Sequence, residues 1–169
     1  MFSTTLDLSA HTSLDEIFDA LYEVFQRDFI EQRTYLNEIV YINPHHQGVR
    51  DGKEETFWHI VTRKNDKTKV REFDVARAQR IEWVKRIIDN HVHTEVKCFY
   101  YFEEDRKIRF YLWAHNHDFL VILQKLGATE SYIVTSFFID NDRKRNKTQK
   151  KFEDYIGKKD NRLLGCEWF

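Results

Sequence analysis

The chain has 169 residues, of which 41% are hydrophobic and 15% aromatic, so it can bury a core and is expected to form a single domain over residues 1–169. This composition excludes a disordered chain, and the two distant cysteines exclude a disulfide framework and a cysteine zinc site. There is no signal-peptide pattern and no apolar run of roughly 18 residues, so we expect a cytoplasmic protein with no membrane partner.

The formal net charge of −1 conceals an uneven distribution of charged residues. Residues 1–33 form an acidic segment with seven acidic and two basic side chains, whereas segments 63–90 and 143–162 each hold nine lysines and arginines. Basic segments on an otherwise acidic chain indicate a surface that binds a polyanion. Solvated lysines on a helix explain the second segment equally well.

The N-terminal part predicts a helix followed by short strands. Ser13 and Glu16 form a capping box, and apolar residues follow at helical spacing, so a helix is expected over 14–32. Residues 38–43 indicate a strand that ends before Pro44, the only proline. Residues 56–63 indicate a second strand, which would contain His59.

Residues 75–89 predict an amphipathic helix with Asp74 as its N-cap. On a helical wheel, Arg80 falls in the middle of the apolar arc. Arg77 lies inside the arc too, but nearer the end of the helix, where its side chain could reach solvent. The arc consists of Ala76, Ile81, Trp83, Val84, Ile87 and Ile88. A guanidinium facing a sheet needs a carboxylate, carbonyl groups or a bound phosphate. Arg80 is therefore either half of a structural ion pair or a phosphate ligand.

The remaining chain predicts four strands and a last helix. Residues 96–103, 107–115, 118–124 and 132–139 are rich in aromatic and β-branched residues and are joined by short turns, which favours an antiparallel meander. Residues 140–157 indicate a basic C-terminal helix. The expected fold class is α+β, with an N-terminal helix, a helix packed on a four- to five-stranded antiparallel meander sheet, and a C-terminal helix.

The strand KIRFYLWAHN places two different kinds of side chain on its two faces. One face is apolar and faces the core. The other face carries Arg109, Tyr111, Trp113 and His115. Such residues stack on unpaired bases and contact phosphates in RNA-binding sheets, but they also suit a face covered by a second layer. In the last strand, Thr135 and Ser136 point to opposite faces, so one hydroxyl faces inward.

Four stretches carry a resemblance to a known group of enzymes. FWHIVTR, RIEWV, RFYLW and YIVTSFFID resemble the metal-independent nucleases of the barnase, EndoU, colicin and RelE fold, in particular their phage-borne branch. The resemblance covers residues 56–155 as a nuclease-like core and leaves the acidic segment 1–33 outside. It implies a toxin-like endoribonuclease in which a ribose 2′-hydroxyl attacks the adjacent phosphate and leaves a 2′,3′-cyclic phosphate.

The residues suit this chemistry. His59 has a side chain suited to proton transfer near neutral pH, Arg80 and Arg71 match the charge on the phosphate, and Thr135 or Ser136 donates a hydrogen bond to a phosphoryl oxygen. We expect substrate contacts from Arg63, Arg71, Arg109, Tyr111, Trp113 and His115. The expected partners are RNA and an inhibitor protein such as an antitoxin. A second proton carrier is missing unless His45, His46 or His115 supplies it.

Several alternatives remain open. The histidine pairs in 45–46, 91–93 and 115–117 lack a supporting carboxylate pattern, so we expect no metal site. No glycine-rich phosphate loop, GxSxG motif or reactive cysteine context is present, and no cofactor is expected. The same basic and aromatic surface suits a binding module that contacts RNA or a protein without cutting. An ADP-ribosyl transferase is a weaker option because no Glu-x-Glu pair supports it.

Overall fold

The computed structural model describes residues 1–169, and its N-terminal helix confirms the predicted start. Helix α1 (Leu14–Gln26) begins where the Ser13 hydroxyl accepts a hydrogen bond from the backbone N–H of Glu16. The Glu16 carboxylate binds the backbone N–H of Thr12 rather than that of Ser13. A π-helix, η1 (Arg27–Glu31), extends α1, so the helical region ends close to the predicted residue 32.

The predicted meander of four strands is confirmed, but the sheet as a whole is mixed. Antiparallel pairing joins β7 (Val96–Phe102), β8 (Ile108–Ala114), β9 (Phe119–Lys125) and β10 (Glu130–Phe138) in sequence. The short strands β1 (Tyr35–Leu36) and β2 (Val40–Ile42) complete the order β1-β2-β10-β9-β8-β7. Strand β2 pairs parallel to β10, so the expected purely antiparallel sheet is wrong at this edge.

The predicted strand over 56–63 is wrong, because most of it is helix α2 (Glu55–Val61). Its run of apolar residues is buried nearly throughout, and a short, continuously buried run has no periodicity that separates a strand from a helix. Only its end forms a strand, β5 (Thr62–Lys64), which pairs with β6 (Arg71–Phe73). A second hairpin, β3 (Val49–Arg50) and β4 (Lys53–Glu54), precedes α2.

The predicted helix over 75–89 forms as two pieces, α3 (Val75–Ala78) and α4 (Ile81–Asp89). Asp74 caps α3 as expected, since its carboxylate accepts a hydrogen bond from the backbone N–H of Arg77. Arg80 is the N-cap residue of α4, between the two pieces, and so does not sit in the middle of a continuous helix. The apolar face of α4 is buried, as the wheel predicts.

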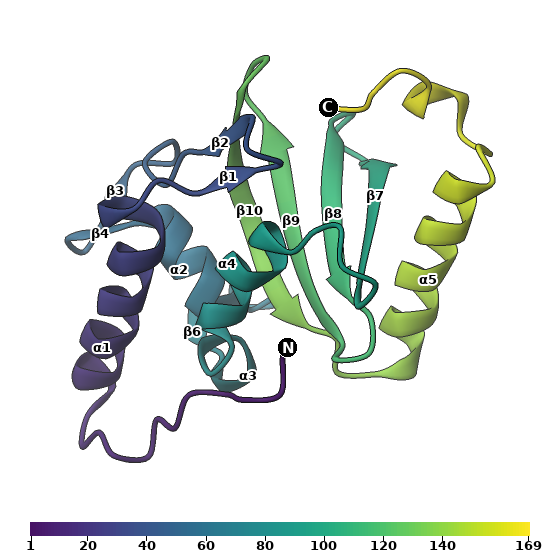
Figure 1. The fold of residues 1–169 in the computed structure, drawn as a ribbon. Helices are drawn as coiled ribbons and strands as arrows, with labels where there is room; N and C mark the ends of the chain where they lie inside the picture. Colours follow the sequence, from purple (N-terminus) through teal and green to yellow (C-terminus); the bar gives the residue numbers. More distant parts are fainter.

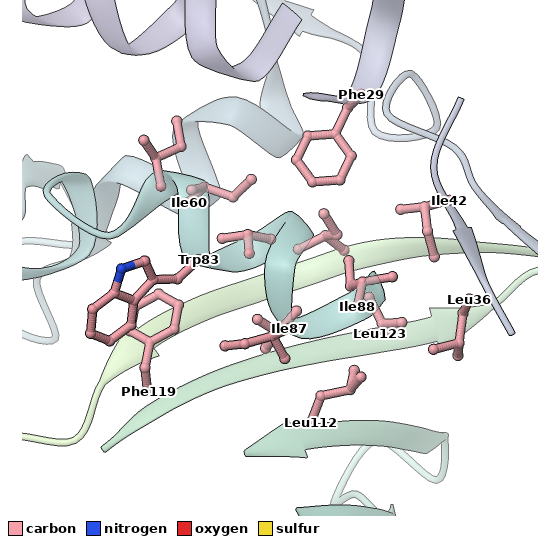
Figure 2. Packing of buried hydrophobic residues seen from close by; sticks show 14 of the residues in the cluster. Phe29, Leu36, Ile42, Ile60, Trp83, Ile87, Ile88, Leu112, Phe119 and Leu123 are labelled. Atoms are coloured by element: carbon pink, nitrogen blue, oxygen red, sulfur yellow. The ribbon is translucent and has the colours of Figure 1, made fainter. Parts of the chain in front are cut away.

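The helices form layers on both faces of the sheet. Figure 1 shows α1 and α4 on one face and α5 (Asp142–Ile156) on the opposite face. On the first face, Ile87 and Ile88 of α4 lie close to Leu123 of the sheet, and Trp83 contacts Phe119 at 5.7 Å between ring centroids (Figure 2). The chain ends with the turn η2 (Asn161–Leu163) and a short tail. No helix combines the length and the apolar character that a bilayer crossing requires.

Helix α1 belongs to the core of the first face. Leu21, Phe25 and the following Phe29 are at most 1% exposed and pack in the same apolar cluster as α4 and the sheet. The acidic segment is therefore a structural part of the fold and contributes apolar side chains to its main core.

Candidate active site

A polar groove of about 590 Å³ lies beside His59, and we call it the His59 groove. It is lined by Gln47, Arg50, Glu55, His59, Lys64, Lys69 and Arg71. No hydrophobic side chain lines it, and four cationic side chains face a single carboxylate. A hollow with this excess of positive charge concentrates anions, so its preferred ligand carries phosphate or carboxylate groups.

Three local elements bring these side chains together. Helix α2 supplies Glu55 and His59, which are four residues apart and so lie on one face of the helix. The β5–β6 hairpin places Lys64 directly opposite Arg71, and side chains of such a pair point to the same face. The β3–β4 hairpin adds Arg50.

Arg50 is held in place by groups on α2. Its Nε donates a hydrogen bond to Oε1 of Glu55 at 2.8 Å, and its guanidinium lies 5.0 Å from the centre of the Trp58 ring. The Trp58 indole N–H donates to the backbone carbonyl of Arg50 at 2.8 Å. Nη2 of Arg50 is buried without a hydrogen-bond partner. This donor has no acceptor within the protein.

Arg71 is fixed by Thr62 at the start of the same hairpin. Its Nε donates to the Thr62 hydroxyl at 2.8 Å, and Nη2 contacts the Thr62 carbonyl oxygen at 3.3 Å. Burial, followed by repulsion from Arg50, lowers the pKa of Arg71. Two guanidinium groups that repel each other at a half-buried site are stabilised when an anion binds between them.

The expectation that His59 titrates near neutral pH is wrong, because its pKa lies well below that range and the ring is neutral at physiological pH. Burial lowers the pKa of its imidazole to about 4, with further lowering by the positive charges of Arg71, Arg50 and Arg77, while Glu55 opposes the shift. Nδ1 is buried without a hydrogen-bond partner. For Nε2 to accept a proton, the neutral ring must carry its hydrogen on Nδ1. Nε2 lies 3.9 Å from the carboxylate oxygen Oε2 of Glu55. The ring can therefore accept a proton beside a carboxylate that stabilises the product.

Arg77 connects the end of α2 to the sheet. Its Nη1 donates to the carbonyl oxygens of His59 at 3.3 Å and Thr62 at 2.9 Å, and to the Thr135 hydroxyl at 3.3 Å. Burial lowers its pKa to about 10, and Asp74 opposes that effect. A cation at the C-terminus of a helix donates hydrogen bonds to the free carbonyl groups and interacts favourably with the helix dipole. Arg77 therefore positions the residues of the groove.

The other predicted catalytic residues lie outside the His59 groove. The guanidinium of Arg80 lies 4.4 Å from the Phe138 ring centre and donates to the carbonyl oxygen of Ala76. Ser136 is fully buried, so it is the inward hydroxyl that was expected, and its Oγ has no partner. Thr135 contacts Arg77 instead of lining the groove. Of the four residues, only His59 lines the groove.

The predicted substrate-binding residues are divided between different parts of the molecule. Arg71 lines the His59 groove, whereas Arg63 points to the other face of the hairpin and lines a separate cavity of about 320 Å³. Arg109 forms an ion pair with Asp105 at 2.8 Å. His115 lies at the end of β8, with its Nε2 3.2 Å from a backbone carbonyl oxygen of the neighbouring loop.

The expectation that Tyr111 and Trp113 form an open surface for bases is wrong. Their exposed fractions are only 4% and 2%, and they belong to a second apolar cluster against which Phe152 and Tyr155 of α5 pack. The alternative, a face covered by a second layer, is confirmed. The basic helix α5 covers these rings with Phe152 and Tyr155, whereas its third apolar side chain, Ile156, is 60% exposed.

Sequence reasoning missed five residues of the groove, namely Gln47, Arg50, Glu55, Lys64 and Lys69. Glu55 and His59 are four apart, a spacing that indicates a shared face only on a helix. The incorrect strand assignment hid this signal. Lys64, Lys69 and Arg71 were visible as part of the basic segment 63–90, but not as a group around the histidine.

Comparisons of the chain with protein-family models, with curated proteins and with solved structures find no match. The structure contains no group of three or more histidine, cysteine, aspartate or glutamate side chains placed to hold a metal ion.

Proposed function

We propose that the protein is a metal-independent endoribonuclease whose active site is the His59 groove. The observation that carries this proposal is the neutral imidazole of His59 beside Glu55, in a groove where four cationic side chains face one carboxylate. A proton acceptor inside a phosphate-binding hollow is the combination that attack by a ribose 2′-hydroxyl requires.

The cations supply the binding and the electrostatic part of catalysis. Arg50 and Arg71 are fixed by protein hydrogen bonds, so they meet a phosphate without further ordering. Their forked donors match two phosphoryl oxygens and remain charged as negative charge builds on the phosphorane. Lys64 and Lys69 extend the positive surface along the hairpin, where a neighbouring phosphate of the strand would lie.

The proton transfer follows from the state of His59. The neutral ring takes the proton of the 2′-hydroxyl at Nε2 while the 2′-oxygen forms a bond to phosphorus and the bond to the 5′-oxygen breaks. The carboxylate of Glu55 stabilises the imidazolium that results. A nearby lysine or water protonates the leaving 5′-oxygen. The products are a 2′,3′-cyclic phosphate and a free 5′-hydroxyl.

The experiment compares RNA affinity with cleavage rate in three variants. With a fluorescent single-stranded RNA, we expect His59→Gln to keep its affinity within about twofold but to lose about 10²- to 10⁴-fold in cleavage rate, the range that a general base contributes. Arg71→Gln should weaken binding as well. Arg86→Gln removes an exposed arginine of α4 and serves as the matched control, with both properties unchanged.

The competing candidate is a non-catalytic RNA-binding module, which uses the same cations. It predicts that wild type binds the RNA and leaves it intact, and that His59→Gln changes neither property. That result would contradict the proposed enzyme.

A further inference from the structure

A cavity of about 360 Å³ lies where β7, the end of α5 and η2 meet, and we call it the Lys151 cavity (Figure 1). It is lined by Tyr100, Tyr101, Lys151, Asp154, Tyr155, Lys159, Asp160, Arg162 and Leu163. Its volume is within the range of small-ligand sites. None of these residues lines the His59 groove, so a ligand bound here is independent of the proposed ribonuclease site.

The ammonium group of Lys151 is held among tyrosine side chains. Its Nζ lies 3.7 Å from the ring centre of Tyr101 and 4.9 Å from that of Tyr111. Its one hydrogen bond is donated to the Tyr111 hydroxyl at 3.3 Å, and Tyr111 in turn donates to the carboxylate of Glu103. Ring faces attract a cation but carry no net charge that would neutralise it. Burial lowers the pKa of Lys151, although Glu103 opposes the shift, and an anion bound beside the ammonium would favour its charged form.

The other charged side chains of the Lys151 cavity are paired with one another. Lys159 forms an ion pair with Asp154 at 3.3 Å. Arg162 donates two hydrogen bonds to the carboxylate of Asp160, at 2.8 and 2.7 Å. Lys151 is therefore the one charged side chain of the lining that has no ion pair. A single positive charge without a direct partner matches a ligand that carries a single negative charge.

A second hollow, also of about 360 Å³, adjoins the Lys151 cavity, and we call it the Leu164 hollow. The two are contiguous because they share four lining residues, namely Asp154, Tyr155, Asp160 and Leu163. Ile156 at the end of α5 and Leu164 in the tail also line this hollow, and they are 60% and 65% exposed. The other charged residues of its lining, Lys158 and Glu167, are of opposite sign. An apolar group that covers Ile156 and Leu164 would gain free energy from their burial.

We propose that the Lys151 cavity and the Leu164 hollow together bind a small carboxylic acid with an apolar body. Its carboxylate lies beside the Lys151 ammonium, and its apolar part lies against Ile156 and Leu164. A carboxylate has one negative charge, the same magnitude as the charge that lacks a partner. A phosphate monoester carries a charge of about −1.5 to −2 and would be repelled more strongly by Asp154 and Asp160. The site therefore selects both for the charge of the ligand and for its apolar chain.

The test is isothermal titration calorimetry of the full chain at pH 7 with three probes that share one alkyl chain: octanoate, 1-octanol and octyl phosphate. We expect wild type to bind octanoate about tenfold more tightly than 1-octanol, because only octanoate pairs with the ammonium. Octyl phosphate should bind more weakly than octanoate. These comparisons need no variant, so they do not depend on how a substitution affects folding.

Three variants then assign the binding to the proposed residues. Lys151→Met keeps an unbranched side chain and removes the charge, so its preference for octanoate over 1-octanol should fall to about twofold or less. Lys147→Met removes the same charge one turn away on α5, outside both hollows, and should keep the preference. Leu164→Asn should weaken the binding of octanoate and of 1-octanol alike, by about fivefold.

Four results would overturn the inference. In wild type they are the absence of octanoate binding, equal affinity for octanoate and 1-octanol, and tighter binding of octyl phosphate. The fourth is a preference for octanoate that survives in Lys151→Met, with circular dichroism showing that the variant is folded.

Discussion

His59 shows how the fold determines the chemistry of a single side chain. An imidazole in water titrates near pH 6.5, but this ring is partly buried, lacks a partner for Nδ1 and is surrounded by three arginines. Burial and the three positive charges disfavour the cation. The protein accepts the cost of an unpaired polar atom at this position, and such costs are typical of functional sites.

The lowered pKa of His59 predicts a pH-dependent loss of stability. Between pH 6.5 and about 4, the unfolded state binds a proton at this residue and the folded state does not, so the free energy of unfolding falls as pH decreases through that window. Between pH 7 and pH 4, the free energy of unfolding of His59→Gln should therefore fall by about 2 kcal/mol less than that of wild type, after allowance for solvent screening. Urea unfolding at both pH values measures this, and equal losses would contradict the neutral ring.

At the scale of elements, the groove depends on how the end of α2 is held against β10. Arg77 of α3 makes this connection through carbonyl groups of α2 and β5 and through the hydroxyl of Thr135. The positive charge of Arg77 is balanced by the carboxylate of Asp74, the N-cap residue of α3, at 3.5 Å. The conformations of α2 and the β5–β6 hairpin are thus coupled through one buried guanidinium.

Replacement of Arg77 should therefore destabilise the protein strongly. In Arg77→Met we expect the free energy of unfolding to fall by about 3 kcal/mol, because buried carbonyl groups and the Asp74 carboxylate lose their partner. Arg86→Met removes an exposed guanidinium that pairs with Glu82, and should cost less than about 1 kcal/mol. Urea midpoints measured at constant slope compare the two variants, and similar losses would show that Arg77 has no special role.

Elements with a clear period were predictable from sequence, and those without one were not. Helix α1 starts after a capping box and has regular apolar spacing, and its prediction is confirmed. Strands β7 to β10 are aromatic and β-branched runs joined by short turns, and their predicted order is confirmed. Residues 55–61 contain four apolar residues and are mostly buried, so local sequence could not distinguish a buried helix from a strand. The parallel pairing of β2 with β10 depends on contacts between distant segments, which periodicity does not report.

The candidate site was predictable only in part, for related reasons. His59 and Arg71 were recognised by residue type, and both line the groove. The misassigned helix hid Glu55, and the break before α4 turned Arg80 toward Phe138. The alternation along β8 was read correctly, but alternation alone does not show whether a second layer covers a face. Helix α5 provides that layer over Trp113.

At the scale of the whole molecule, the charge distribution concentrates positive side chains where the proposed phosphates bind. The net charge is −1, yet the His59 groove holds four cations against one carboxylate. Many lysines and arginines of α5 are paired with neighbouring acids, on the other face of the sheet. The overall charge therefore gives little indication of the partner, whereas the local excess on the two hairpins favours a polyanion.

The proposed active site is tested most directly by incubation of wild type and His59→Gln with total RNA in the presence of EDTA, followed by analysis of the fragment ends. We expect fragments with 2′,3′-cyclic phosphate and 5′-hydroxyl ends from wild type, and almost none from a folded His59→Gln. Intact RNA with wild type, or equal cleavage by both proteins, would contradict the assignment of the His59 groove as a ribonuclease active site.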